Sequence, residues 1–239
     1  MYIDLHCHYV PAVDDGVRTT EEGIALCRGL AGLGYTTLVA TPHIRTAMFD
    51  NEPAGLAQAH AAFAQTAQTL GDLPALGLAA EHFCDDVFWT RLERGDVLRY
   101  PGGHALLIEL PPERFPLGLA EGCFQMQVKG VRPVLAHPER YPPLFRSTDA
   151  IERLVEMGVV PQLDLMSLGE RYGRAPRKAA ERMLREGVYG LAATDSHKPE
   201  HVEIVAEAIS RLHALVGQAY AVRLLAEAPA AILAGRFDA

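Results

Sequence analysis

Histidine and carboxylate residues recur along the chain, each close to the end of a short apolar run. The segment IDLHCH at residues 3–8 places His6 and His8 two positions apart. Side chains alternate between the two faces of a strand, so both imidazoles would point to one side and Cys7 to the other. Neutral imidazole is the most common protein ligand of metal ions. The pair therefore suggests a metal site, although a chain with ten histidines can also bring two together by chance.

Six expected strands end near a side chain that can bind a metal ion. Their motifs, in chain order, are DLHCH with VDDG, ATPH, AEH, LIEL, AHPER and TDSH. They supply the candidate ligands His6, His8, Asp15, His43, Glu81, Glu109, His137, Asp195 and His197. A single histidine at a strand end is most often structural, but Glu109 lies in an otherwise apolar run, where a buried carboxylate needs a compensating partner. Together the six strand ends favour a metal centre over coincidence.

The number and charge of these ligands indicate how many ions they bind and what those ions attract. Nine ligands are too many for one ion that must leave room for a substrate, but they suit three. Asp15, Glu81, Glu109 and Asp195 are negatively charged, so three divalent cations would leave a net charge of about +2. Such a centre suits a phosphate dianion. Oxygen and imidazole ligands without thiolate fit Mn, Fe or Zn and do not select one.

The strand ends must meet at one edge of a sheet for these residues to act together. Apolar runs alternate with amphipathic stretches, which predicts βαβ units and a parallel sheet. Strands are expected at Tyr2–Cys7, Thr36–Thr41, Ala75–His82, Ala105–Leu110, Pro133–Ala136, Val159–Asp164 and Tyr189–Thr194. Helices are expected after the capping box Thr19-x-x-Glu22, over Leu56–Leu70, and at Ala150–Met157, Pro176–Glu186 and Glu200–Leu215. This pattern predicts one α/β domain over residues 1–239, folded as a closed or nearly closed barrel.

Composition excludes several classes of protein. Hydrophobic residues make up 49% of the 239 residues and charged residues 22%, as in ordinary globular proteins. The net charge of −8 argues against sequence-independent binding of nucleic acid. We see no signal-peptide pattern and no apolar run long enough to span a membrane, and the four cysteines are scattered. We therefore expect a cytoplasmic protein with reduced thiols and no membrane insertion.

Two rival chemistries can be tested by residue spacing. A cysteine-dependent phosphatase needs Cys-x5-Arg, but the residues six positions after the four cysteines are Val13, Leu33, Thr90 and Lys129. None is arginine, so that mechanism is excluded, and no Walker-type or dinucleotide glycine loop occurs either. A hydrolase of the amidohydrolase type shares the His-x-His opening. It usually needs a carboxylated lysine at a later strand end, and no expected strand ends in lysine.

The ordered motifs resemble those of the polymerase-and-histidinol-phosphatase (PHP) superfamily. They are most similar to its branch of bacterial tyrosine phosphatases encoded with capsule and exopolysaccharide genes. The resemblance runs from Asp4 to APAAIL near the end of the chain, and it includes MF at 48–49 and GERY at 169–172. It implies a distorted (β/α)7 barrel of the PHP type, with a trinuclear centre that often contains manganese in this branch.

The resemblance also implies a role for each site residue. The first ion would be bound by His6, His8, Glu81 and Asp195. The second would take Glu81 as a bridge, with Glu109 and His137, and the third would take Asp15, His43 and His197. Arg140 in HPER would bind the phosphoryl oxygens, and Arg45 is a further candidate for substrate binding. The remaining histidines match no ligand motif and are expected to be structural or exposed: His60, His82, His104, His201 and His213.

We therefore expect a metal-dependent phosphomonoesterase, most closely a protein-tyrosine phosphatase. Its substrate would be the tyrosine-rich tail of an autokinase of polysaccharide export. A hydroxide bridging two ions would attack phosphorus in line, while Arg140 and the ions stabilise the equatorial oxygens. Asp195 or a metal-bound water could donate a proton to the leaving group if one is needed.

The sequence leaves two alternatives open, and it leaves the oligomeric state open as well. One is a phosphatase of the same fold that acts on a small molecule such as histidinol phosphate. The other is a PHP module that binds metals or a partner without turnover. Members of the branch often carry a second arginine after the Asp-x-His motif, whereas this chain has Lys198 and His201 but no arginine there. That departure concerns the substrate rather than the phosphate chemistry.

Overall fold

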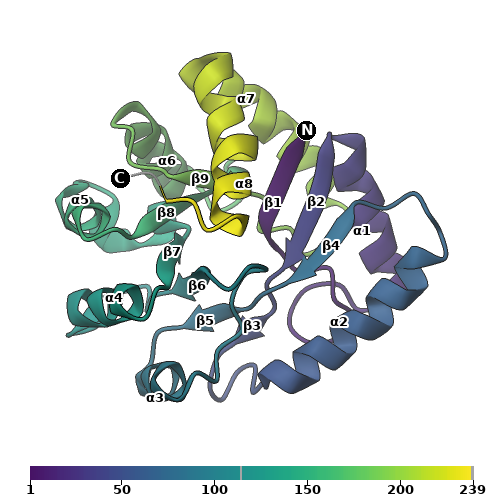
Figure 1. The fold of residues 1–239 in the computed structure, drawn as a ribbon. Coiled ribbons are helices and arrows are strands. Elements are labelled where there is room, and N and C mark those ends of the chain that lie inside the picture. Colours follow the sequence, from purple (N-terminus) through teal and green to yellow (C-terminus); the bar gives the residue numbers. More distant parts are fainter. Residues whose placement is uncertain (114, 238–239) are drawn as a thin grey trace.

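Parallel strands surround a common centre in this computed structural model, with helices packed around them (Figure 1). The structure describes residues 1–113 and 115–237. The strands are β1 (Tyr2–Cys7), β2 (Tyr35–Ala40), β3 (His43–Ile44), β4 (Ala75–Leu78), β5 (Glu81–Phe83), β6 (Ala105–Glu109), β7 (Arg132–Ala136), β8 (Val160–Asp164) and β9 (Leu191–Ala193). The α-helices are α1 (Thr20–Gly32), α2 (Pro53–Gln68), α3 (Asp86–Arg94), α4 (Leu119–Val128), α5 (Asp149–Glu156), α6 (Arg174–Arg185), α7 (His201–Val222) and α8 (Ala228–Leu233). Short 3₁₀ turns cover Pro138–Arg140, Pro142–Leu144 and Leu165–Ser167, and a π-helical turn covers Arg223–Glu227.

The nine strands of the described ranges form seven segments of one barrel wall, because two segments are interrupted. One sheet has the order β1-β2-β4 and the other β3-β5-β6-β7-β8-β9, and all their pairings are parallel. β2 and β3 are separated at Pro42, which has no amide hydrogen to donate. The amide of Glu81 still donates to the Pro42 carbonyl at 3.2 Å, so the two sheets are continuous. The single strand expected at Ala75–His82 is therefore wrong in detail, because it is split into β4 and β5.

The wall closes between its first and last segments. The amide of Asp195 donates to the His6 carbonyl at 2.9 Å, and the amide of His8 donates to the Ser196 carbonyl at 2.9 Å. Beside these bonds, the buried Asp4 carboxylate accepts hydrogen bonds from the amide and the hydroxyl of Thr194. These contacts join β1 to the end of β9, and they confirm the predicted distorted (β/α)7 barrel.

Three helices, α3, α4 and α8, were not predicted. α3 and α4 are both short, and α4 begins after Gly118 without a side-chain cap and contains a second glycine, Gly122. A Cβ at Gly122 would clash with the ring of Trp89 on α3, so glycine allows these two helices to pack closely. Glycine disfavours a helix in isolation, and here tertiary packing outweighs that preference.

The inside of the barrel is filled with apolar side chains at one end. Leu5, Val39, Leu107, Val134 and Leu191 form this inner cluster with Ile232 of α8, and all are buried. Burying each such side chain contributes roughly 1.5–3 kcal/mol. α8 lies across the centre of the ring in Figure 1, so it covers the end where the strands begin. The carboxyl ends of the strands point to the opposite face.

Across the described ranges, every helix is either too short or too polar to cross a lipid bilayer.

The predicted Thr19 cap at the start of α1 is confirmed, with the return bond of Glu22 shifted to Arg18, and the cap can be tested by mutation. The Thr19 hydroxyl accepts a hydrogen bond from the amide of Glu22 at 3.2 Å, and Glu22 accepts one from the amide of Arg18 at 2.6 Å. Thr19→Ala should lower the free energy of unfolding by about 1 kcal/mol in urea denaturation. Thr66→Ala, on an exposed face inside α2, is the matched control and should not destabilise, because alanine favours helix interiors. Equal losses in the two variants would contradict the capping role.

Candidate metal centre

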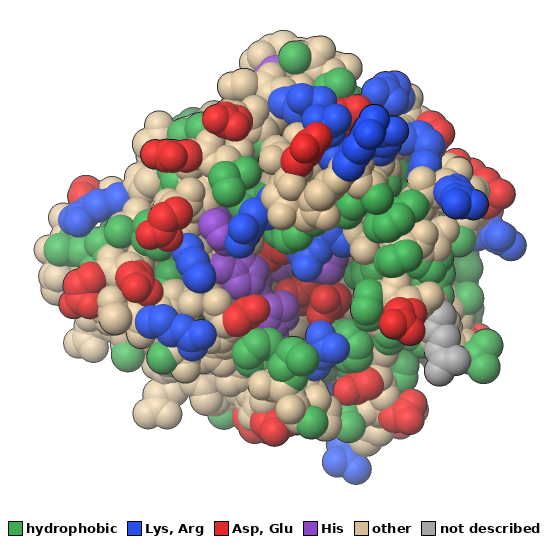
Figure 2. Space-filling view, turned by 180° about the vertical axis from the view of Figure 1, so that it is seen from behind, with side chains coloured by type: hydrophobic (Ala, Val, Ile, Leu, Met, Phe, Trp, Pro, Cys, Tyr) green, Lys and Arg blue, Asp and Glu red, His purple; other side chains and the backbone are tan. Residues whose placement is uncertain are grey.

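The predicted ligands converge on the face where the strands end. Figure 2 shows that face, with histidine side chains gathered in a hollow among acidic and basic residues. The cavity in this hollow is lined by Asp15, His43, Arg45, Met48, Phe49, Glu109, His137, Arg140, Asp195 and His197. His6, His8 and Glu81 are each no more than 1% exposed. The structure therefore brings together residues that are far apart in the sequence.

Glu81, at the start of β5, contacts three of the histidines. Its Oε2 atom lies 3.2 Å from Nε2 of His6 on β1 and 3.0 Å from Nδ1 of His43 on β3. Its Oε1 atom lies 3.0 Å from Nε2 of His137, which directly follows β7. One buried carboxylate thus joins three strand ends.

Two aspartates connect the remaining histidines. Oδ1 of Asp195 lies 3.1 Å from Nε2 of His6 and 3.3 Å from Nε2 of His8, and neither pair has hydrogen-bond geometry. Oδ1 of Asp15 lies 3.4 Å from Nε2 of His43 and 3.5 Å from Nε2 of His197. The rings of His8 and His197 stack, with centroids 3.9 Å apart.

These separations fit donor atoms that share a metal ion. Two ligand atoms bound at about 2.1 Å lie about 3.0 Å apart at right angles and about 3.4 Å apart at the tetrahedral angle. The distances from Glu81, Asp195 and Asp15 to the histidine nitrogens, between 3.0 and 3.5 Å, cover this range. The centroids of the His6 and His137 rings are 5.9 Å apart, which is close enough for neighbouring ions to bind both.

Donor atoms of the described residues form three groups in which all members lie within 4.8 Å of one another. The groups are His6, His8 and Glu81; His43, Glu81 and Glu109; and His8, Asp15, His43 and His197. They correspond in part to the three ligand sets that the resemblance implies. The difference is that His43 rather than His137 lies within this distance of both Glu81 and Glu109, while His8 also reaches the group around Asp15.

Residues behind the histidines orient their rings. Nδ1 of His6 lies 2.7 Å from Oε1 of Gln162, and Nδ1 of His8 lies 2.7 Å from Oδ2 of Asp14. Nδ1 of His197 donates to the backbone carbonyl of Asp195 at 2.7 Å. When Nδ1 carries the hydrogen, the Nε2 lone pair faces inward and can bind a metal, as is typical of metal-binding histidines.

Asp14 and Gln162 are not among the residues predicted from the sequence. Asp14 directly precedes the predicted ligand Asp15, and Gln162 is a polar residue within the apolar strand β8. Both features of the sequence could have indicated residues near the site. Of the histidines expected to be structural or exposed, His201 lies beside the site, because its Nδ1 accepts from the amide of His197 at 3.2 Å. His82 is buried and accepts from the amide of Leu98.

The charges of the site favour cations. Burial opposes ionisation of Glu81, but His6 and His43 hold its pKa well below the ordinary value. Burial likewise opposes protonation of His6, yet the charges of Glu81 and Asp195 raise its pKa well above the ordinary value. Burial and the Glu81 charge raise the pKa of Glu109 to about 7. Divalent ions would supply the positive charge that this cluster of carboxylates requires.

Two arginines lie in the same cavity. Nη1 of Arg140 is 2.7 Å from Oδ2 of Asp195, and its guanidinium carbon lies 4.3 Å from the centre of the Tyr172 ring. The guanidinium carbon of Arg45 lies 4.1 Å from the centre of the Phe83 ring. Both predicted arginines are therefore within the site, each against an aromatic ring.

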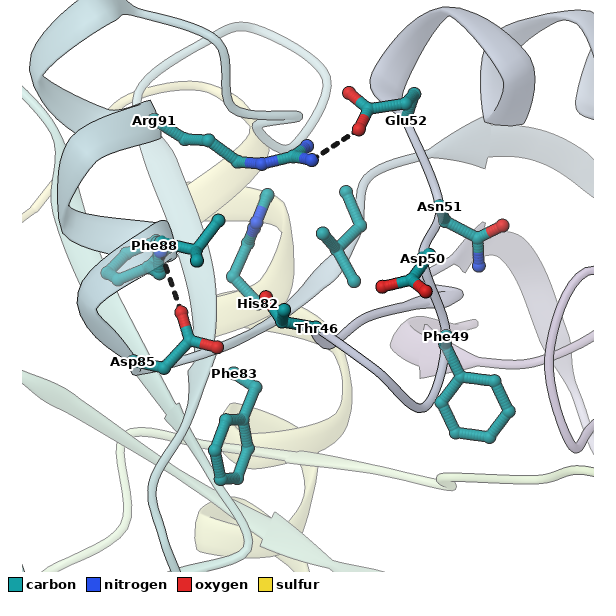
Figure 3. Close-up of a pocket in the computed structure, with 12 residues that line it drawn as sticks. Thr46, Phe49, Asp50, Asn51, Glu52, His82, Phe83, Asp85, Phe88 and Arg91 are labelled. Atoms are coloured by element: carbon teal, nitrogen blue, oxygen red, sulfur yellow. Dashed lines mark hydrogen bonds and ion pairs between the residues drawn. The ribbon is translucent and has the colours of Figure 1, made fainter.

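A short hairpin forms the rim beside Arg45. The backbones of Arg45 and Phe49 exchange hydrogen bonds of 3.0 and 2.8 Å, and the Phe49 ring stacks on the His43 ring at 5.1 Å. Met48 at its tip is 58% exposed. Figure 3 shows the small cavity on the other side of this rim, where an ion pair between Glu52 and Arg91 connects the chain after the hairpin to α3. The rim thus presents apolar side chains, supported from behind, next to the metal ligands.

Comparison with known proteins identifies the family. The model for capsular polysaccharide synthesis, CpsB/CapC, matches residues 2–234. This chain belongs to the CpsB/CapC family. It is 29% identical to the tyrosine-protein phosphatase YwqE of Bacillus subtilis (strain 168) over 196 residues, 82% of this chain and 77% of YwqE. It is 27% identical to the tyrosine-protein phosphatase CpsB of Streptococcus pneumoniae over 201 residues, 82% of either chain.

The fold of this CpsB/CapC chain is also similar to solved structures. A structure from the work on YwqE of Bacillus subtilis and CpsB of Streptococcus pneumoniae, described as unique metal-dependent tyrosine phosphatases, superposes with a TM-score of 0.91. The two sequences are 25% identical, and the match covers 98% of this chain and 95% of the other. A prolidase superposes with a TM-score of 0.61 at 10% identity, which shows a shared fold alone.

Metal binding should be visible in the thermal stability of the protein. Adding Mn²⁺ at about one hundred times its dissociation constant to chelator-treated protein should raise the melting temperature by about 5–10 °C. Glu81→Ala and His43→Ala should lose most of this increase, because each removes a donor from two of the three groups. His104→Ala, an exposed histidine outside the site, is the control and should keep it. An equal increase in all four proteins would mean that the metal binds elsewhere.

Proposed function

We propose that this protein is a metal-dependent phosphomonoesterase that hydrolyses phosphotyrosine in proteins. The observation that carries the proposal is the convergence of carboxylates and imidazoles from six strand ends around the buried Glu81, with Arg140 in the same cavity. Relatives in the family bear the name tyrosine-protein phosphatase, which supports the choice of substrate.

The metal centre of this proposal consists of three divalent ions bound by the nine predicted ligands. Manganese is the proposed ion, with iron and zinc as alternatives, because oxygen and imidazole donors suit all three. When bound, such ions lower the pKa of a coordinated water and attract the charge of a phosphate ester. The chain contributes the oriented imidazoles, with Gln162 and Asp14 fixing the rings of His6 and His8.

Four side chains around the centre bear on the proposed reaction. Arg140 would bind two phosphoryl oxygens, since a guanidinium matches phosphate in a bidentate manner. Arg45 would contribute a second positive charge, and Phe49 would contact the phenol ring. His6 and His197 hold the pKa of Asp195 well below its ordinary value against the effect of burial, so Asp195 would stay ionised and have no proton to donate. A phenolate is a reasonably good leaving group, and we propose that it departs without strong acid assistance.

The proposed partner is the phosphorylated tail of a tyrosine autokinase of polysaccharide export, and the proposed location is the cytoplasm. The family description supports the link to capsule synthesis. Asp15 and Met48 at the cavity are more than half exposed, so a tyrosine on a peptide could reach the ions. The four cysteines are free thiols, which fits a reducing compartment.

A panel of substrates tests the proposed function. Mn²⁺-loaded protein should hydrolyse phosphotyrosine peptides with a higher kcat/KM than histidinol phosphate or phosphoserine peptides, because the open rim admits a peptide and contacts its ring. A preference for histidinol phosphate would favour the small-molecule alternative. No turnover of any ester by metal-loaded protein would favour the module that binds without catalysis.

Replacing Arg140 separates phosphate binding from metal binding. Arg140→Ala should lower kcat/KM about 30- to 1000-fold, by analogy with removing one oxyanion donor, and Arg140→Lys should recover little of it. The metal content should not fall, because removing a cation beside Asp195 leaves the site more negative. Elemental analysis and steady-state kinetics on the same samples measure both. Full activity of Arg140→Ala with its metals retained would remove Arg140 from the site.

A further inference from the structure

One barrel segment, β8, supplies none of the predicted site residues, yet it ends in a carboxylate. Asp164 is 2% exposed, and its Oδ1 atom accepts from the amide of Met166 at 2.8 Å. Its Oδ2 atom is buried and has no hydrogen-bond partner among the described residues. Nη1 of Arg140 lies 3.6 Å from this oxygen, which is too long for a hydrogen bond.

The chain that follows β8 also covers one face of Arg140. Tyr172, between the 3₁₀ turn Leu165–Ser167 and α6, places its ring 4.3 Å from the guanidinium carbon of Arg140. A guanidinium stacked on a ring keeps its N–H groups in the plane free for other partners. The ring therefore fixes the orientation of Arg140 without occupying the donors that a phosphate needs.

Glu139, which directly precedes Arg140, connects the turn to the end of β8. Glu139 is fully buried, and its Oε1 atom accepts from the amide of Asp164 at 3.0 Å and from the hydroxyl of Ser167 at 2.9 Å. Its Oε2 atom accepts from the hydroxyl of Tyr189 at 2.8 Å. The turn that carries Arg140 is thus bound to the end of β8, so Asp164 and Tyr172 have a fixed position relative to it.

Of Asp195, Asp164 and Tyr172, which contact Arg140, only Asp195 is also a proposed metal ligand. Asp195 gives the shortest contact, 2.7 Å, but the proposed function makes it a metal ligand as well. An ion bound to Asp195 would share its charge and weaken the pair with Arg140. Asp164 and Tyr172 lie in none of the three donor groups, so their contacts would remain.

We propose that Asp164 and Tyr172 are positioning residues that hold the Arg140 guanidinium toward the phosphate when Asp195 binds metal. This inference rests on the proposed function. It adds that the Asp164 carboxyl group packs against Arg140 at a distance that leaves the N–H groups free, and that Tyr172 fixes the plane of the guanidinium.

A double-mutant cycle tests the proposal, with binding of inorganic phosphate to Mn²⁺-loaded protein measured by calorimetry beside the kinetics of an aryl phosphate. Tyr172→Leu and Asp164→Asn should each weaken phosphate binding and raise KM about tenfold, and metal content should be unchanged. In the Arg140→Ala background the same changes should have almost no further effect, since the group that they orient is gone. Tyr172→Phe keeps the ring and should show only a part of the loss.

Glu170→Gln is the matched control. Glu170 lies in the same loop as Tyr172, but its charge pairs with Arg177 of α6 rather than with Arg140. This variant should leave phosphate binding unchanged. Tyr172 is partly exposed, so its variants should fold even if Asp164→Asn does not. Equal losses with and without Arg140, or normal phosphate binding by Tyr172→Leu, would overturn the proposal. Phosphate binding needs no turnover, so absence of phosphatase activity would contradict the proposed function while the cycle still decides this inference.

Discussion

Glu81 is a carboxylate with 1% of its surface exposed, and its charge must be balanced inside the protein. Three histidines from three strand ends face it, and two of them lie close to a further carboxylate, His6 to Asp195 and His43 to Asp15. The site is therefore a cluster of negative charges surrounded by imidazoles, which is stable only with positive charge at its centre. Divalent ions bound there would allow a protein of net charge −8 to attract a phosphate.

The barrel meets this need through its closure. Hydrogen bonds between the ends of β1 and β9 bring His6 and His8 beside Asp195, although these residues are nearly the whole chain apart. The interior is apolar at the end that α8 covers and polar at the other end. The apolar end stabilises the barrel, and the polar end holds the candidate ligands. The turn after β7 then places Arg140 over the ligands, with Glu139 fastening it from beneath.

The strands and the candidate ligands could be predicted because their signals are local: a His, Asp or Glu at the end of an apolar run reveals both. α3 and α4 could not be predicted, because the close packing of Gly122 on α4 against Trp89 on α3 is a tertiary contact. Asp14, Gln162, Asp164 and Tyr172 were missed for a related reason. Each acts on the side chain of another residue, and that partner becomes visible only when the barrel closes.

The roles assigned to the site all require divalent ions around Glu81. Anomalous diffraction from crystals of Mn²⁺-loaded protein, recorded on both sides of the manganese absorption edge, would locate such ions. We expect up to three anomalous peaks, with ions at about 2.0–2.3 Å from the Glu81 carboxylate and from the histidines facing it. Crystals that contain manganese but show no peak within bonding distance of Glu81 would contradict these roles.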